Sequence, residues 1–361
     1  TTMSELSDKI RSEFKKADDE RDALMNTPED IERWDNIVYG HDDREMQRLD
    51  VYRPKQAQGE DLPVIISVHG GAWMYGDKER YQYYCMSLAQ RGFAVVNFTY
   101  RLAPESKFPA QLEDVNLVCK WVMKRAGRFH FDTERIFAVG DSAGAHLLGL
   151  YAAICTNPAY AAKYDFAVPE GFALTAIALN CGVYRIPREG ADNMTMLIMK
   201  ELLPEGGTEE ELESIDVLNG IIKDEKVKLT YIPGNHDMGF TAENVNIAMP
   251  GVNQARDAGN KYGVGTYHPD GFTEIAIEHG HRYDFFCALT PNANEADAPG
   301  SLLPPGYFFS RIAANSFTDP TTHEAATKVH EVKLNDATNP EQYTKYIYYS
   351  LWKKVIQDVI Y

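Results

Sequence analysis

The sequence predicts an α/β fold in which a mostly parallel sheet is covered by helices on both faces. Short apolar runs rich in Val and Ile recur along the chain, and stretches with the apolar spacing of helices lie between them. Alternating strands and helices are typical of a parallel sheet that is buried on both faces. The 361 residues, 44% of them hydrophobic, are enough for a large core, either in one domain with a lid or in two smaller domains.

Seven apolar runs are expected to be strands, and three amphipathic stretches are expected to be helices. The strands are at residues 49–52, 64–68, 94–98, 136–139, 174–179, 227–232 and 274–278, and the helices at 80–90, 111–125 and 143–154. The charged stretch 3–25 predicts an exposed helix laid on another element, as part of a lid. The methionine-rich residues 194–199 suit either a lid over an apolar pocket or a surface helix whose side chains fill gaps in the core.

The charge of the chain limits its partners. Lys and Arg number 36 and Asp and Glu number 53, which gives a net charge of −17. This charge repels nucleic acids and anionic membrane surfaces, and it favours a neutral or cationic small molecule. Residues 1–16 contain no apolar run of the kind that a signal peptide or membrane helix needs, so a cytoplasmic location is expected. The five scattered cysteines are expected to be reduced, without a zinc or redox role.

A candidate nucleophile follows the fourth expected strand. Residues 140–144 read GDSAG and lie between an apolar strand and a helical pattern. A serine on such a sharp turn has a strained backbone, so its neighbours must be small, and its hydroxyl is exposed for attack. This pattern predicts that Ser142 is the nucleophile of an acyl-transfer reaction.

A candidate oxyanion loop follows the second expected strand. Residues 69–73 read HGGAW, and two adjacent glycines allow backbone N–H groups to approach a ligand closely. Gly70 and Gly71, together with the N–H of Ala143, are therefore expected to stabilise a negative oxygen. His69 is expected to anchor the loop by hydrogen bonds.

Three blocks of sequence resemble the hormone-sensitive-lipase-like α/β-hydrolases in their order and spacing. They are residues 69–73, residues 100–105 (YRLAPE) with FPA at 108–110, and residues 140–144. The resemblance covers about residues 45–222 and implies an α/β-hydrolase fold and an esterase for short acyl esters. It also implies that Ser142 is the nucleophile and that no metal or organic cofactor is required.

The chain is also expected to divide into three parts. Residues 1–45 would be a helical lid segment, residues 46–290 the hydrolase core with a lid insertion at about 157–218, and residues 291–361 an extension without an assigned role. Trp73 and Tyr75 are expected to line an apolar acyl pocket. The expected partner is a small-molecule ester, and the sequence leaves open whether the protein forms a homodimer.

The acid and base of a serine hydrolase with this fold follow the nucleophile in the chain. The strand expected at 227–232 is followed by PGNHD, which resembles the strand and Gly-x-x-Asp of the family and indicates Asp237 as the acid. The strand expected at 274–278 ends at His279-Gly280-His281, where the family has His-Gly-Phe. His279 is the first candidate for the base, and His281 is the second.

A second resemblance offers a different function for the last part of the chain. Residues 226–361 are also similar to the C-terminal half of calcineurin-like metallophosphoesterases, which have Gly-Asn-His-Asp and His-x-His blocks. Asn235, His279 and His281 would then bind metal, although the upstream Asp-x-His block of that family is missing from the sequence. A third possibility is a composite chain with a broken triad that binds ligands without catalysis.

Overall fold

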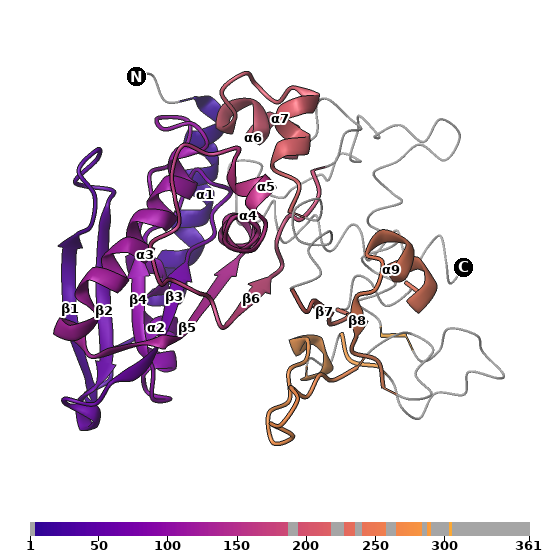
Figure 1. Cartoon of the computed structure of the whole chain (residues 1–361). Coiled ribbons are helices and arrows are strands. Elements are labelled where there is room, and N and C mark those ends of the chain that lie inside the picture. The colour runs from indigo at the N-terminus through magenta and orange to yellow at the C-terminus, as the bar shows by residue number, and fades with distance from the viewer. Residues whose placement is uncertain are drawn as a thin grey trace, which may run out of the picture. The chain divides into compact units, whose positions relative to one another are not determined.

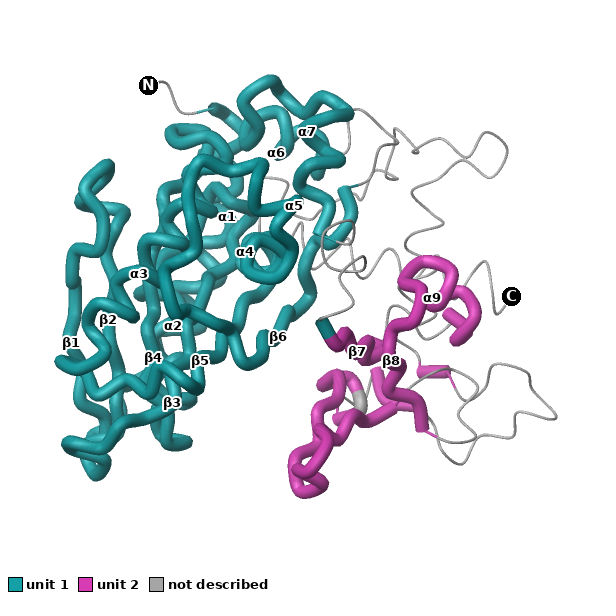
Figure 2. The backbone as a smooth tube through the Cα atoms, in the orientation of Figure 1, with its two compact units in different colours: residues 1–227 teal, residues 228–361 magenta. Residues whose placement is uncertain are grey.

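The computed structural model describes residues 4–186, 194–217, 227–234, 240–257, 265–283, 287–289 and 303–304. The chain divides into two compact units, residues 1–227 and residues 228–361 (Figure 2). Within the described ranges, none of the helices combines the length and the apolar composition that crossing a membrane requires. The boundaries expected at residues 45 and 290 stay predictions.

The first unit is built on a sheet of six strands in the order β1-β2-β4-β3-β5-β6 (Figure 1). Strands β4, β3, β5 and β6 run parallel, whereas β1 and β2 pair antiparallel at one edge. The strands are β1 (Ile31–Val38), β2 (Arg48–Pro54), β3 (Leu62–Val68), β4 (Ala94–Phe98), β5 (Phe131–Asp141) and β6 (Ala176–Asn180). The predicted α/β fold with a mostly parallel sheet is confirmed.

Helices cover both faces of this sheet, because successive side chains of a strand point to opposite sides. On one face, Ile65 packs with Met86 of α2 (Lys78–Ala89). On the other face, the neighbouring residues Val64 and Ile66 belong to the larger core with α3 (Ala110–Phe129) and α4 (Ala143–Thr156). The helices predicted at 80–90, 111–125 and 143–154 are thus confirmed as α2, α3 and α4.

The remaining helices of the first unit are shorter or lie apart from the sheet. Helix α1 (Glu5–Asp22) corresponds to the predicted N-terminal helix and begins at Ser4, whose side chain accepts a hydrogen bond from the N–H of Ser7. The methionine-rich stretch forms α6 (Met194–Leu202), in which Met199 is fully buried and Met194 is half exposed. Two short helices, α5 (Pro158–Ala161) and α7 (Glu209–Ser214), complete the helices described in this unit, beside a 3₁₀ turn at Lys55–Ala57.

Strand β1 was not expected from the sequence. Its residues IERWDNIV mix charged and apolar side chains, and most of them are only half buried because β1 is the edge strand. A bulge between Trp34 and Ile37 interrupts the pairing with β2. The bulge shifts the alternation of inward and outward side chains, so the period-2 pattern that marks a strand is lost.

The second unit contains little regular structure in its described part. Strands β7 (Thr230–Tyr231) and β8 (Asn253–Gln254) pair with each other, and α9 (Ala242–Ala248) and a 3₁₀ turn (Gly280–Tyr283) accompany them.

The strand predicted at 274–278 is wrong. Among the described residues, its backbone pairs with another segment at Ile277 alone, which exchanges two hydrogen bonds of 2.8 Å with Tyr267. Both Ile275 and Ile277 are more than 40% exposed, so the alternating apolar face that predicted the strand is not buried. The strand predicted at 227–232 is reduced to the two residues of β7, in a separate two-stranded sheet.

Candidate active site

The two motifs meet at the carboxyl edge of the parallel sheet. The chain passes from β3 to β4 on one side and returns to β5 on the other side of β3. Loops that leave adjacent strands in opposite directions open a crevice at the ends of those strands. Residues 69–73 follow β3 and residues 140–144 follow β5, so this crevice brings the glycine loop and the serine turn together.

Ser142 has the strained backbone expected of a nucleophile elbow. Its φ is +50° and its ψ is −117°, at the junction between β5 and α4. The Ser142 N–H donates to the carbonyl oxygen of Asn180 at the end of β6, at 2.9 Å. This bond helps to hold a conformation that would otherwise be costly for a residue with a side chain.

The two glycines of the elbow have no space for a side chain. A Cβ on Gly140 would lie 2.7 Å from the backbone of Gly144. A Cβ on Gly144 would lie 2.1 Å from the carbonyl oxygen of Val68 and 2.5 Å from that of His69. The elbow is therefore packed directly against the start of the glycine loop.

The glycine loop is a tight turn. Gly71 has a φ of +118°, and its carbonyl oxygen accepts hydrogen bonds from the N–H groups of Met74 and Tyr75 at 3.1 and 2.9 Å. A Cβ on Gly71 would approach the carbonyl oxygen of Tyr75 to 2.1 Å. The N–H of Gly70, in contrast, donates to the hydroxyl of Tyr81 at 3.1 Å, so it is already bound to a protein acceptor.

His69 anchors this loop and is held as a neutral imidazole. Its Nδ1 donates to the carbonyl oxygen of Gly70 at 2.7 Å, and its ring stacks on Tyr100 with centroids 4.0 Å apart. The Tyr100 hydroxyl donates to the His69 carbonyl oxygen at 3.0 Å. Complete burial lowers the pKa of His69 to about 4. The expected anchoring role of His69 agrees with these contacts.

Trp73 and Tyr75 are expected to line an acyl pocket. In the structure, the side chains of both residues contact other side chains of the first unit. Trp73 is 3% exposed and meets the ring of His146 edge-on at 5.1 Å. Burial lowers the pKa of His146 to about 4, and its Nε2 donates to the carbonyl oxygen of Ile215 at 2.9 Å. The Tyr75 hydroxyl donates to Asp18 of α1 at 2.9 Å.

Arg11 fastens helix α1 to the glycine loop, a role that the sequence did not reveal. Its guanidinium donates to the carbonyl oxygens of Met74 and Ala103 at 2.8 and 3.1 Å and to both carboxylate oxygens of Glu105. Ala103 in turn donates its N–H to the carbonyl oxygen of Trp73 at 2.9 Å. The YRLAPE block and α1 therefore support the glycine loop from two sides.

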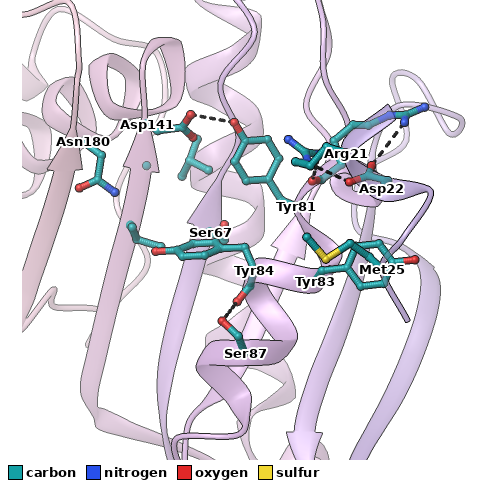
Figure 3. Close-up of a pocket in the computed structure, with 14 residues that line it drawn as sticks. Arg21, Asp22, Met25, Ser67, Tyr81, Tyr83, Tyr84, Ser87, Asp141 and Asn180 are labelled. Carbon is teal, nitrogen blue, oxygen red and sulfur yellow. Dashed lines mark hydrogen bonds and ion pairs between the residues drawn. The ribbon is translucent and has the colours of Figure 1, made fainter. Parts of the chain in front are cut away.

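A cavity of about 560 Å³ lies beside the elbow, in the first unit. Figure 3 shows residues that line it. Asp141, the residue before Ser142, lies on its wall, and the Tyr81 hydroxyl points at the Asp141 carboxylate. Burial raises the pKa of Asp141, and burial together with the Asp141 charge raises the pKa of Tyr81. Tyr81 and Asp141 had not been identified from the sequence. No motif marks a tyrosine eleven residues after the glycine that it contacts.

The second unit holds the two candidate bases, and they contact each other. The Nδ1 atoms of His279 and His281 are 2.8 Å apart, and the N–H of His281 donates to Nδ1 of His279 at 3.3 Å. Because a backbone N–H can only donate, Nδ1 of His279 is an acceptor, and Nδ1 of His281 must carry the proton. In this arrangement the lone pair of His281 lies on Nε2.

The other candidates of the second unit are outside the described residues. These are Asp237, the expected acid, and Asn235, the expected metal ligand of the alternative function. In the described part of the chain, no group of three or more His, Cys, Asp or Glu side chains is arranged to hold a metal ion. In the described part of the first unit, the structure shows no hydrogen bond between a histidine side chain and Ser142.

Together, the sheet order, the turn at the end of β5 and the glycine loop at the end of β3 give the first unit an α/β-hydrolase fold. Residues 49–183 match the family model BD-FAE.

Its relatives with curated descriptions include esterases. Esterase LipC of Mycobacterium tuberculosis is 33% identical over 149 residues, which are 41% of this chain and 35% of LipC. Esterase LipQ of the same species is 34% identical over 166 residues, which are 45% of this chain and 38% of LipQ. The matched region thus spans less than two fifths of each relative.

Solved structures agree with the sequence comparisons. The chain is similar to esterase B from Lactobacillus rhamnosis inhibited with a tributyrin phosphonate, with a TM-score of 0.58 and 26% identity over 65% of this chain and 77% of that one. The predicted resemblance of residues 45–222 to esterases with an α/β-hydrolase fold is confirmed. The resemblance of residues 226–361 to metallophosphoesterases receives no support from these matches.

Proposed function

We propose that the protein is a carboxylic ester hydrolase in which Ser142 is the nucleophile. The observation that carries this proposal is the Ser142 backbone, with a φ of +50° at the turn from β5 into α4. Such strain persists only where the surrounding structure imposes it, and it clusters at functional sites. The match of residues 49–183 to the family model BD-FAE and the similarity of the chain to esterases LipC and LipQ support the same reaction.

The proposed reaction has two halves. The Ser142 Oγ attacks the ester carbonyl carbon while a histidine takes the hydroxyl proton, and the resulting tetrahedral intermediate carries a negative oxygen. The C–O bond to the alcohol then breaks, and the histidine returns the proton to the departing alcohol. Water attacks the acyl-enzyme in the same way, which releases the carboxylic acid and restores the Ser142 hydroxyl.

Two backbone N–H groups are the proposed donors to the negative oxygen. Ala143 is the first residue of α4, where N–H groups have no acceptor within the helix. Gly71 supplies the donor from the loop after β3, as this type of hydrolase requires. Gly70 was also expected to donate, but its N–H is bound by Tyr81, so we assign it to the support of the loop.

For the base we propose His279 or His281, with Asp237 as the acid that orients it. The hydrogen bonds between the two histidines favour His281, because its Nδ1 carries the proton and its Nε2 has the lone pair. A general base in a serine hydrolase needs this tautomer. His279 would then orient His281, and Asp237 would act on the pair.

Short-chain acyl esters are the proposed substrates. Esterase B from Lactobacillus rhamnosis was crystallised with a tributyrin phosphonate, which suggests butyrate esters as the first substrates to test. Trp73 contributes to an apolar environment beside the loop, although its ring is packed into the core. The net charge of −17 disfavours polyanionic substrates.

The test is hydrolysis of p-nitrophenyl butyrate by the wild type, by Ser142→Ala and by Ser87→Ala. Ser87 lies on α2 at the wall of the cavity beside the elbow, where its hydroxyl donates to the carbonyl oxygen of Tyr84, so its variant removes a nearby serine hydroxyl that is not on the elbow and controls for handling and folding. Loss of the nucleophile is expected to reduce kcat on the order of a thousandfold or more. Undiminished turnover in Ser142→Ala would refute the serine mechanism.

The same assay separates the ester hydrolase from the two alternative functions. Hydrolysis that disappears with EDTA and returns with manganese or zinc would assign the activity to a metal site in residues 226–361. A protein that binds the ester but shows no burst of p-nitrophenol would be a ligand-binding protein with a broken triad. We expect turnover that is unaffected by EDTA.

A further inference from the structure

The hydroxyl of Tyr81 connects the glycine loop to the elbow. It accepts a hydrogen bond from the N–H of Gly70 at 3.1 Å and donates one to Oδ2 of Asp141 at 2.8 Å (Figure 3). Gly70 follows β3 and Asp141 ends β5, so one atom joins the two loops that would carry the oxyanion donors.

The bridge is held in place by helix α2 and by the crowding around Gly70. Tyr81 lies in the first turn of α2, and Asp77 caps this helix by accepting the N–H of Arg80 at 3.0 Å. Gly70 is confined from the other side, because a Cβ there would lie 2.9 Å from the Asp141 carboxylate and 3.1 Å from the Tyr81 hydroxyl. The Gly70 peptide therefore has little freedom to rotate while the bridge is intact.

The bridge acts on the neighbours of the reacting groups. Gly70 precedes Gly71, and Asp141 precedes Ser142 and Ala143. Fixing the Gly70 peptide fixes the start of the turn whose next N–H is the proposed donor. Fixing Asp141 holds the last residue of β5 before the strained serine. Oxyanion stabilisation depends on donors that are already in place before charge develops.

We propose that Tyr81 is a positioning residue for ester hydrolysis, which sets the distance between the oxyanion donors of Gly71 and Ala143. This inference rests on the proposed function. It assigns Tyr81 no contact with the substrate, and it explains why the Gly70 N–H is directed at a side chain. Loss of the hydroxyl should therefore weaken the binding of the transition state and leave the binding of the ester nearly unchanged.

The decisive variant is Tyr81→Phe, which keeps the ring and removes both hydrogen bonds of the hydroxyl. Tyr84→Phe is the matched control, because Tyr84 lies on the same helix and lines the same cavity but is not part of the bridge. With p-nitrophenyl butyrate, kcat of Tyr81→Phe is expected to fall about tenfold to hundredfold, with KM within about threefold of wild type. Tyr84→Phe should keep wild-type kcat.

A second measurement separates positioning from general loosening of the fold. Butylboronic acid bonds reversibly to a serine Oγ and places a boron-bound oxygen where the oxyanion forms. Its inhibition constant should rise in Tyr81→Phe by about the factor by which kcat/KM falls. Equal inhibition constants for wild type and Tyr81→Phe would overturn the proposal, and so would a kcat within about twofold of wild type.

Variants at the other end of the bridge cover the case in which Tyr81→Phe does not fold. Asp141→Asn keeps an oxygen that can accept from Tyr81, so its boronate affinity should stay within a few-fold of wild type, whereas Asp141→Ala should lose affinity as Tyr81→Phe does. Equal affinities of these two variants would overturn the proposal.

If wild type and Ser142→Ala are equally inactive, the proposed function itself fails. If wild type turns over and Tyr81→Phe matches it, only the role of Tyr81 is refuted.

Discussion

Gly144 lies so close to Val68 that a Cβ on the glycine would come within 2.1 Å of the valine carbonyl oxygen. The first turn of α4 thus rests on the last residue of β3, with no space between the elbow and the glycine loop. This contact joins the two strand ends on which the proposed chemistry depends.

The variant Gly144→Ala is expected to be destabilised and inactive. The added methyl group would force the backbone of Val68 and His69 to move, which costs about 1 to 3 kcal/mol in a packed core and displaces the glycine loop. Gly127→Ala is the control, since Gly127 lies in α3 with nothing within 4 Å of its added Cβ. Urea unfolding and butyrate hydrolysis should show a loss for Gly144→Ala and unchanged or slightly higher stability for Gly127→Ala. Wild-type activity in Gly144→Ala would contradict the packing described here.

Arg11→Ala is expected to loosen α1 from the glycine loop. The wild-type Arg11 guanidinium binds two backbone carbonyls and the Glu105 carboxylate. Each hydrogen bond of a charged group contributes at most about 1.5 to 3 kcal/mol to the stability of a fold. Lys15→Ala is the control, because Lys15 pairs with Asp19 on the exposed side of the same helix. Hydrogen exchange of residues 5–22 should become faster in Arg11→Ala and stay the same in Lys15→Ala. Equal protection in both variants would mean that Arg11 does not hold the helix.

The stability of the fold is expected to fall as the pH decreases from about 6.5 to 4. Burial lowers the pKa of His69 and of His146 from 6.5 to about 4, so the unfolded chain binds protons in this range and the folded chain does not. The contribution of these two histidines to the free energy of unfolding is therefore fully present above pH 6.5, and about 3 kcal/mol per histidine is lost by about pH 4.

Urea titrations across this pH range test the effect. His146→Gln should show a shallower loss of stability with falling pH than the wild type, because one buried imidazole is gone. His130→Gln serves as the control, since the His130 side chain is 46% exposed. A wild-type slope in His146→Gln would show that the buried imidazole is not the titrating group.

His281→Ala is expected to reduce kcat nearly as much as Ser142→Ala, because members of a triad act as a unit. His279→Ala should cost less if His279 only orients His281 through the 2.8 Å contact of their Nδ1 atoms. Asp237→Asn should also cost less than loss of the base. Measured side by side on p-nitrophenyl butyrate, a larger loss in His279→Ala would reverse the assignment. Near-wild-type turnover in both histidine variants would exclude the second unit from the triad.

Local patterns in the sequence predicted the frame of the first unit. The apolar runs at 64–68, 94–98 and 136–139 are strands. Each run could be predicted locally, because its own β-branched side chains favour a strand that is buried in a parallel sheet. The elbow was also predictable, since the small residues at 140 and 144 are required by atoms within a few residues of Ser142 and by the adjacent strand. The same reasoning failed at 274–278, where the alternating pattern makes a single isolated bridge, between Ile277 and Tyr267, in the part of the chain that the structure describes.

Only the tertiary structure revealed which side chains support the glycine loop. Tyr81 reaches Asp141 across 60 positions of sequence, and Arg11 reaches Met74 across 63. No local pattern records such partners, because the crossover from β3 through α2 and β4 to β5 decides which loops become neighbours. The sequence by itself determined that Ser142 stands on an elbow after one strand and that a glycine loop follows another. The packing of α1 and α2 against that loop decided that the Gly70 N–H is bound by Tyr81. A backbone donor at a crowded strand end pairs with the acceptor that the fold brings within reach.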